Sequence, residues 1–283
     1  MPSIDEVLGL REIAPATFRA DPVPTEMERT FGGQVAGQAL SAAARTVPPE
    51  FGVHSVHGHF LRPGRPLDPT DYRVDAVRDG GSFRTRYVTA VQDGETVFTL
   101  TASFHRGDDG YTHQAAMPAT AGPEEIAENG RPWAAWYDFP EWDDWERRWL
   151  PADEATPDVP SRRRLWIRHR TPLPDDPVLH ACALTYCSDM ALLDIAVLPH
   201  PDRPIQGASL DHAVWFLRPF RVDEWLLFDQ VSPSSESGRA LIQGQIFDTA
   251  GRLVAAVAQE GMVRFHTERA AAVGAGRAEG RAE

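Results

Sequence analysis

Asp189 is the side chain whose place in the sequence points most clearly to chemistry. It lies in the apolar stretch 179–197, which is too long for a strand and is followed by Leu198-Pro199, where a helix cannot continue. The stretch predicts one helix with apolar residues all round it, buried at the centre of a fold. An ionised carboxylate in such surroundings costs several kcal/mol unless charges or hydrogen bonds compensate it. Asp189 is therefore expected either to act in catalysis or to be a structural carboxylate that caps a nearby backbone or pairs with an arginine.

Other reactive side chains of this predicted helix do not extend the site. Asp194 is separated from Asp189 by about 140° of rotation at about 100° per residue, so a paired-carboxylate site is not expected. The only cysteines, Cys182 and Cys187, have the same separation and cannot bridge each other within the helix. They are interpreted as buried thiols, with a nucleophilic role for Cys187 as the alternative.

His57 and His59 alternate onto one face of a predicted strand, an arrangement that could hold a metal ion. No carboxylate or thiol stands at a suitable spacing in the sequence, so they are interpreted as strand or pocket histidines, and no metal is expected. The helical sequence 31–47 opens with paired glycines, but no lysine follows at the spacing of a phosphate-binding loop. Gly33 and Gly37 are instead expected to let other backbone approach closely.

Two series of elements carry these residues. Each starts with a strand, continues with a helix and ends with an antiparallel meander of strands joined by polar turns. The first series has an edge strand at 18–23, a helix at 31–47, and strands at 55–61, 71–77, 83–92 and 96–105. The second has a strand at 165–170, the helix at 179–197, and strands at 207–217, 225–232, 240–247 and 253–264. A helix on one face of a curved antiparallel sheet predicts an α+β fold.

The two series repeat each other. The matching segments are Phe60-Leu61-Arg62-Pro63 with Phe216-Leu217-Arg218-Pro219, Ser82-Phe83-Arg84 with Ser237-Gly238-Arg239, and the turn residue Gly94 with Gly251. Their nearly constant separation along the chain predicts two copies of one unit. Joining the two sheets edge to edge would remove an exposed strand edge from each and leave both helices on one side.

Four segments follow from this repeat. Residues 1–107 form the N-terminal unit and 163–266 the C-terminal unit, while 267–283 are small and charged and are expected to be a disordered tail. Residues 108–162 form an acidic, proline-rich connection. It carries Trp133, Trp136, Trp142, Trp145 and Trp149. These aromatic residues are expected to pack the connection onto a domain or a neighbouring subunit.

The composition excludes several classes of partner. With 283 residues, a net charge of −13 and a pI near 5.2, the chain lacks the basic character of proteins that bind nucleic acid or anionic membranes. No uninterrupted apolar run approaches the length needed to span a bilayer, and the first residues lack the basic and apolar regions of a signal peptide. A cytoplasmic protein is expected.

Five ordered motifs resemble those of the acyl-CoA thioesterase II family. They are Phe31-Gly32-Gly33-Gln34-Val35-Ala36-Gly37-Gln38-Ala39, His57-Gly58-His59-Phe60-Leu61-Arg62-Pro63-Gly64, Leu184-Thr185-Tyr186-Cys187-Ser188-Asp189, Leu210-Asp211-His212-Ala213-Val214-Trp215-Phe216 and Gln259-Glu260-Gly261. The resemblance covers about 21–264 apart from the tryptophan-rich connection. It implies a double hot-dog fold, in which two helix-wrapped antiparallel sheets pack as a pseudo-dimer.

The resemblance also implies an activity and a site. The family hydrolyses acyl-CoA to fatty acid and CoA without a covalent intermediate, using an aspartate, a threonine or serine, and a glutamine that hold a water. By motif position these fall on Asp189, Ser209 and Gln259. Serine in place of the threonine common in the family keeps the hydroxyl but loses the methyl that restricts its rotamer.

No metal or redox cofactor is implied, and acyl-CoA is the expected ligand. Arg84 and Arg239 are candidates for contacts with the CoA phosphates at the mouth of the groove, with solvated surface charge as the alternative reading. In hot-dog enzymes the negative charge that develops on the thioester oxygen is commonly stabilised by a backbone N–H near a helix start. Because exposed sheet faces in this fold usually assemble further, a homo-oligomer is expected.

Three other functions fit the sequence less well. A serine hydrolase built on Ser209, Asp211 and His212 is excluded, because in a strand Ser209 and Asp211 project to one face and His212 to the other. No Gly-x-Ser-x-Gly segment occurs either. An enoyl-thioester hydratase of the same fold would need an Asp-x-Asn-Pro-x-His segment, which is missing. A non-catalytic acyl-CoA-binding protein would have no need of a buried carboxylate and Gln259 beside the thioester.

Overall fold

The computed structural model describes residues 2–128, 139–151, 161–190, 192–200 and 205–265. The helices of the described residues are α1 Ile4–Val7, α2 Gly32–Ala44 and α3 Pro177–Ser188, with short 3-10 helices η1 Pro123–Glu125, η3 Pro140–Trp142 and η4 Leu193–Ala196. The strands of the first half are β1 Arg11–Ala14, β2 Thr17–Ala20, β3 Gly52–Phe60, β4 Thr70–Asp79, β5 Phe83–Gln92 and β6 Glu95–His105. Those of the second half are β7 Trp145–Trp149, β8 Arg162–His169, β9 Ile205–Ser209, β10 Asp211–Phe216, β11 Leu226–Glu236, β12 Arg239–Asp248 and β13 Leu253–Phe265.

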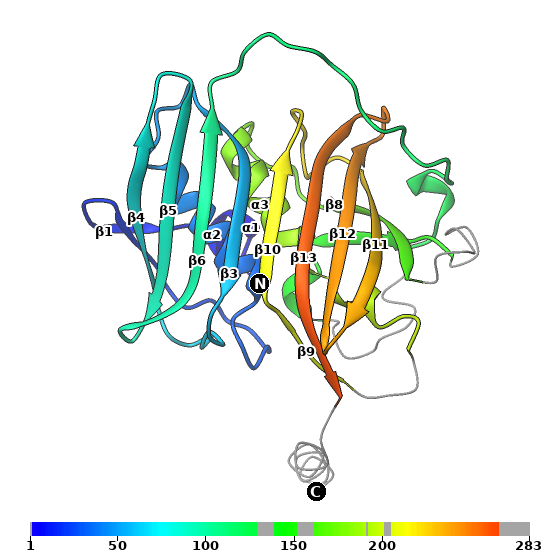
Figure 1. Ribbon diagram of the computed structural model, residues 1–283, viewed down its shortest axis with the longest axis horizontal. Helices are drawn as coiled ribbons and strands as arrows, with labels where there is room; N and C mark the ends of the chain where they lie inside the picture. Colours follow the sequence, from blue (N-terminus) through cyan, green and yellow to red (C-terminus); the bar gives the residue numbers. More distant parts are fainter. Residues whose placement is uncertain (1, 129–138, 152–160, 191, 201–204, 266–283) are drawn as a thin grey trace, which may run out of the picture.

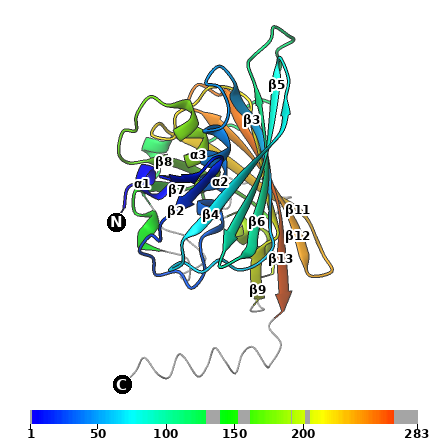
Figure 2. The same cartoon turned by 90° about the vertical axis from the view of Figure 1, so that its left-hand side faces the viewer.

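All these strands form one antiparallel sheet, in the order β1-β2-β4-β5-β6-β3-β10-β13-β12-β11-β8-β7, with β9 paired to β13 (Figure 1). Strands β3 and β10 join the two halves, from the pair Ser55 and Trp215 to the pair His59 and Asp211. The helices lie on one side of this sheet (Figure 2). The expected edge-to-edge joining of two helix-wrapped sheets, which defines a double hot-dog fold, is confirmed.

The internal repeat is visible in matching hydrogen bonds where β3 and β10 end. The backbone N–H of Arg62 donates to the carbonyl of Val97 at 3.2 Å, and that of Arg218 donates to the carbonyl of Val254 at 3.3 Å. Both arginines therefore bind the edge of the neighbouring strand in the same way, one in each half. The two halves are therefore structural repeats that match even in individual backbone hydrogen bonds.

Small residues set the distance between the two central helices. A Cβ placed on Gly33 would come within 2.2 Å of the carbonyl oxygen of Tyr186, and one on Gly37 within 2.9 Å of the carbonyl oxygen of Cys182. No side chain fits at these positions, so α2 and α3 touch backbone to backbone. The close approach expected from the glycines is confirmed.

The prediction of a single helix over 179–197 is wrong. Asp176 caps the beginning of α3 by accepting the backbone N–H of Val178 at 2.9 Å, and the helix ends at Ser188 with Asp189 as its C-cap. The hydroxyl of Ser188 contacts the carbonyl oxygen of Thr185 at 3.1 Å, a local bond of the kind that competes with continuing a helix. Asp189 thus lies at a helix end rather than in its middle.

By length and composition alone, the stretch Pro177–Ala196 could cross a membrane, with a mean hydropathy of 1.3. However, 71% of it is buried inside the protein. Its apolar surface is therefore covered by the sheet and the neighbouring helix, as for the core helix of a globular domain.

The prediction of one strand over 207–217 is also wrong. The segment forms β9 and β10, which are separated at Leu210 and both pair with β13. Ser209 lies opposite Gly261, whereas Ala213 lies opposite Ala258, so one more residue stands on the β9–β10 side than on β13. This β-bulge changes which side chains share a face, because it interrupts the alternation of the strand.

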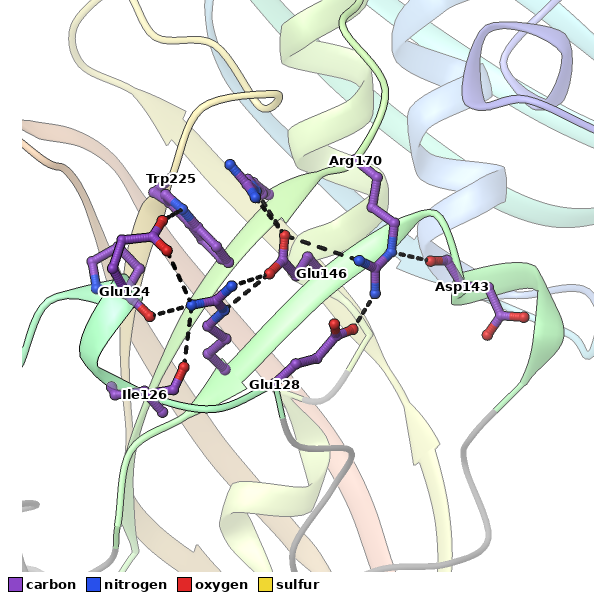
Figure 3. Close-up of polar contacts among 10 residues, drawn as sticks. Glu124, Ile126, Glu128, Asp143, Glu146, Arg170 and Trp225 are labelled. Carbon is purple, nitrogen blue, oxygen red and sulfur yellow. Dashed lines mark hydrogen bonds and ion pairs between the residues drawn. The ribbon is translucent and has the colours of Figure 1, made fainter.

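Part of the predicted connection is packed as expected from its tryptophans. Strand β7 lies within it, pairs with β8 at the edge of the sheet, and buries Trp145 and Trp149. Figure 3 shows the polar side of this region, where the buried carboxylate of Glu146 accepts Arg148 Nε at 2.9 Å and Arg168 Nε at 2.8 Å. The β7 part of this segment is thus held by aromatic burial and ion pairing, whereas Trp133 and Trp136 lie outside the described residues. The division into segments stays a prediction, and the expected tail lies outside the described residues.

Candidate active site

Asp189 lines a cavity of about 460 Å³ where the end of α3 meets the beginning of α2. The walls of this cavity include Phe31 and Gly32 from the start of α2 and Ser209 from the end of β9. The two halves of the chain both contribute to it, since α2 belongs to the first and α3 and β9 to the second.

The structure brings Asp189, Ser209 and Gln259 together. Ser209 Oγ donates to Asp189 Oδ1 at 3.3 Å, and Gln259 Nε2 donates to Ser209 Oγ at 2.5 Å. Gln259 is 1% exposed, whereas Ser209 and Asp189 are only partly buried. The chain of hydrogen bonds therefore runs from the interior to the wall of the cavity and ends on a carboxylate.

A fourth residue, His212, extends this chain inward and was not predicted. Its ring is 1% exposed, with Nδ1 at 2.8 Å from Gln259 Oε1 and Nε2 at 2.8 Å from Ser188 Oγ. An amide oxygen only accepts, so His212 must carry a proton on Nδ1. This fixes the orientation of the Gln259 amide, whose NH₂ group then points to Ser209. Each group donates to the next, and the series ends at Asp189.

The β-bulge at Leu210 explains why sequence reasoning missed His212. In an unbroken strand Ser209 and His212 would face opposite sides of the sheet. The extra residue brings both side chains to Gln259, while Asp211 turns to the other face and contacts His57 Nε2 at 2.9 Å. The prediction that Ser209, Asp211 and His212 lie in one unbroken strand is therefore wrong. The triad remains excluded, because Asp211 contacts His57 on the other face of the sheet.

Burial of Asp189 raises the pKa of its carboxyl group above the ordinary value of an aspartic acid. Desolvation is the largest cause, because it disfavours the charged form. The positive potential of His212, hydrogen bonds from Gln259 and Ser209, and a backbone hydrogen bond from Gly33 act in the opposite direction but are smaller. Asp189 is thus a stronger base than a solvated aspartate.

Two glycines at the start of α2 contact this carboxylate, Gly32 by leaving room for it and Gly33 by a backbone hydrogen bond. A Cβ on Gly32 would lie 2.7 Å from Asp189 Oδ2 and 2.9 Å from the ring of Phe60. Gly33 supplies a backbone N–H to the same carboxylate. Because the first backbone N–H groups of a helix have no partner within it, the beginning of α2 also offers donors to a negatively charged atom in the cavity.

Asp194 differs from the expectation. The angle that separated it from Asp189 assumed one continuous helix, and that helix is broken, so both acids line the same cavity. Cys182 and Cys187 are free and buried, and burial raises the pKa of both thiols, which disfavours the thiolate needed for a nucleophile.

The arginines considered for CoA lie elsewhere. Arg84 forms an ion pair with Asp79 at 3.0 Å, and Arg239 forms one with Glu260 at 2.8 Å. Neither is among the residues that line the cavity of Asp189. The reading of these two arginines as paired surface charge is therefore the better supported one.

Models of two protein families match this chain. The model described as acyl-CoA thioesterase matches residues 146–262, and the one described as acyl-CoA thioesterase N-terminal domain matches residues 19–105. Together they cover both halves of the sheet.

Named relatives and solved structures agree with these models. Acyl-coenzyme A thioesterase 8 of Rattus norvegicus is 35% identical over 86% of this chain and 82% of its own length. Acyl-CoA thioesterase 2 of Haemophilus influenzae is 32% identical over 92% and 96%. A crystal structure of acyl-CoA thioesterase II TesB2 from Mycobacterium marinum is 47% identical, covers 94% of this chain and 99% of that one, and superposes with a TM-score of 0.85. On this likeness of sequence and fold, the chain belongs to the acyl-CoA thioesterase family and is an enzyme of that class.

Proposed function

We propose that this enzyme hydrolyses acyl-CoA to a free fatty acid and CoA by direct attack of a water held by Asp189, Ser209 and Gln259. The observation that carries this assignment is the one-way series of hydrogen bonds from Gln259 through Ser209 to Asp189, which ends at the wall of a cavity. One oxygen of this carboxylate is held by Ser209, and Asp189 lines the cavity in which a substrate carbonyl and a water would lie.

In the first step, a water donates a proton to Asp189 while its oxygen attacks the thioester carbonyl carbon. The new C–O bond forms as the π electrons of the carbonyl move to its oxygen, giving a tetrahedral oxyanion. When the carbonyl re-forms, the C–S bond breaks and the CoA sulfur leaves with the bonding electrons. The proton held by Asp189 then passes to the products. The raised pKa of Asp189 supports this role, since a general base is most effective when its pKa lies near the working pH.

Ser209 and Gln259 position the water and the carboxylate of Asp189, and neither attacks the thioester. Gln259 donates to Ser209 Oγ, which occupies one lone pair of that oxygen and directs the single hydroxyl proton of Ser209 to Asp189. His212 sets the orientation of Gln259 from behind. If His212, Gln259 or Ser209 is removed, the hydrogen bonds that orient the remaining side chains are lost. Asp189 is then displaced from the water, and its contribution to the rate falls.

The oxyanion is assigned to the first turn of α2. The backbone N–H groups there include that of Gly33, which Asp189 already uses, and their helix dipole favours negative charge at this end. No acidic side chain stands in the first turn of α2 to compete for them.

Two further expectations remain proposals. The sheet face opposite the helices exposes apolar side chains, Trp215 at 44% and Leu241 at 38%, and we propose that it mediates a homo-oligomer. Sedimentation analysis of the purified protein tests this, and a monomer at micromolar concentration would contradict it. A cytoplasmic location is proposed from the composition alone and is tested by cell fractionation.

The decisive experiment follows release of the CoA thiol from a chain-length series of acyl-CoAs. The native enzyme is compared with Asp189→Asn, which keeps the size of the side chain and removes the base, and with Asp93→Asn, whose carboxylate is exposed in the β5–β6 turn. We expect turnover to fall about a hundredfold or more in Asp189→Asn and to be unchanged in Asp93→Asn. Full activity of Asp189→Asn would remove Asp189 from the mechanism. Tight acyl-CoA binding without turnover by the native protein would indicate a binding protein instead.

A further inference from the structure

Three side chains with metal-binding chemistry meet on the sheet where its two halves join. They are His57 and His59 of β3 and Asp211 of β10, and one ligand atom from each lies within 4.8 Å of the other two. His57 Nε2 is 2.9 Å from Asp211 Oδ2, and the two imidazole rings are 4.6 Å apart between centroids. None of the three takes part in the hydrogen bonds of the catalytic series.

The pairing of β3 with β10 creates this cluster. His57 and His59 are two residues apart and face the same side of β3, and Asp211 lies directly opposite His59. Ala213 lies opposite His57, and its small side chain leaves room for the diagonal contact between Asp211 and His57. The carboxylate that the two histidines lacked in the sequence is thus supplied by a residue from the other half of the chain.

Two imidazoles and one carboxylate form a donor set suited to zinc and related first-row ions, with water completing the coordination. Asp211 is held for this role, since its Oδ1 accepts the backbone N–H of Glu260 at 2.6 Å and Oδ2 points to the histidines. The side chains of His57 and Asp211 are 49% and 26% exposed, which leaves access from solvent. Donor atoms around a tetrahedral zinc ion are about 3.4 Å apart. The three ligand atoms here lie within 4.8 Å of one another, so small rotations of the exposed imidazole rings bring them to that spacing.

From this geometry we infer that His57, His59 and Asp211 bind one divalent transition-metal ion of the Zn²⁺ type. The ion links β3 of the first half to β10 of the second, so it holds the junction of the two sheets. Since binding to the folded state alone raises stability, Zn²⁺ at this site should stabilise the whole sheet.

The test uses the full chain without an affinity tag, stripped with a chelator and then titrated with ZnSO₄ in a calorimeter. His59→Gln is the diagnostic variant, because His59 is exposed and stands outside the bond between His57 and Asp211. The matched control is His113→Gln, an exposed histidine of the connection. One ion is expected to bind to the native protein and to His113→Gln, with about tenfold or greater weakening in His59→Gln.

A second measurement distinguishes Zn²⁺ binding at this specific site from non-specific binding to the protein surface. The midpoint of thermal unfolding should rise with Zn²⁺ concentration in the native protein and in His113→Gln, but not in His59→Gln or Asp211→Asn. Absence of binding to the native protein would overturn the inference. So would equal binding and equal stabilisation in all four proteins, because the ion would then lie elsewhere.

Discussion

Replacing Gly33 by alanine tests the geometry on which the catalytic assignment rests. The added Cβ would lie 2.2 Å from the carbonyl oxygen of Tyr186, against an ordinary contact of at least 3.4 Å, so α2 must move away from α3 by about 1.2 Å. The obstacle is a backbone carbonyl, which cannot rotate away as a flexible side chain would. The same movement draws the backbone N–H of Gly33 away from Asp189.

Two opposing effects decide the sign of the change in stability. Alanine favours a helix over glycine by up to about 1 kcal/mol, less in a first turn, whereas overpacking at a rigid contact costs about 1–3 kcal/mol. With an overlap of this size the cost prevails, and Gly33→Ala should lower the free energy of unfolding by about 2 kcal/mol. At about 2–4 °C per kcal/mol, the midpoint of thermal unfolding should fall by about 4–8 °C.

The effect on catalysis should exceed the effect on stability. A misplacement of about 1 Å can reduce the rate about a hundredfold, so kcat should fall by that order while the protein remains folded at 25 °C. Thiol release measures kcat, and urea unfolding measures stability. Gly81→Ala is the control, because a Cβ there meets nothing within 4 Å. If Gly33→Ala kept both native stability and native kcat, the proposed backbone contact and its role in placing Asp189 would be refuted.

The remaining predictions concern the catalytic series. Asp189→Asn should be more stable than the native enzyme at neutral pH. Because the pKa of Asp189 is raised in the folded state, the stability contributed by this carboxyl group is fully present below its unfolded pKa and is lost as pH rises through its folded pKa. Urea unfolding at several pH values should show the difference between the two proteins growing across that interval, and an identical pH dependence would contradict this. Ser209→Thr should keep kcat within about threefold of the native value. Ser209→Ala should lower kcat about tenfold, because it removes one hydrogen bond worth about 1.4 kcal/mol; thiol release measures both. His212→Phe leaves the buried carbonyl of Gln259 without a donor, which should cost about 1–3 kcal/mol of stability and lower kcat with little change in KM. Native unfolding and kinetics in this variant would mean that Gln259 is oriented by something else.

Features that depend on local sequence could be predicted well. The glycines that let α2 and α3 touch, the hairpins of the first half and the repeat of Phe60-Leu61-Arg62-Pro63 all follow from residue type and spacing, and the structure confirms them. Asp189 could be singled out because burial of a carboxylate is costly wherever it occurs. Ser209 and Gln259 carried no such signal, and only the family resemblance pointed to them.

Features that depend on partners distant in the chain could not be predicted. The end of α3 is hidden because apolar residues continue past Ser188 without any amphipathic pattern that would mark a boundary. The bulge at Leu210 is defined by pairing with β13, so the place of His212 in the site could not be read from alternation alone. Asp211 likewise meets His57 only because two strands from different halves lie side by side.

The backbone segment that runs from β6 to β7 and β8 has a consequence for how the enzyme behaves on dilution. Gly33 comes from one repeat and Asp189, Ser209 and Gln259 from the other, yet a single covalent chain carries both. In a dimer of two separate hot-dog chains, such a site would come apart when the protein concentration fell below the dissociation constant. Here the segment between β6 and β8 links the two repeats covalently. The effective concentration of one repeat at the other therefore stays high, whatever the protein concentration. Activity per molecule should therefore be set by folding alone, even where the enzyme is scarce.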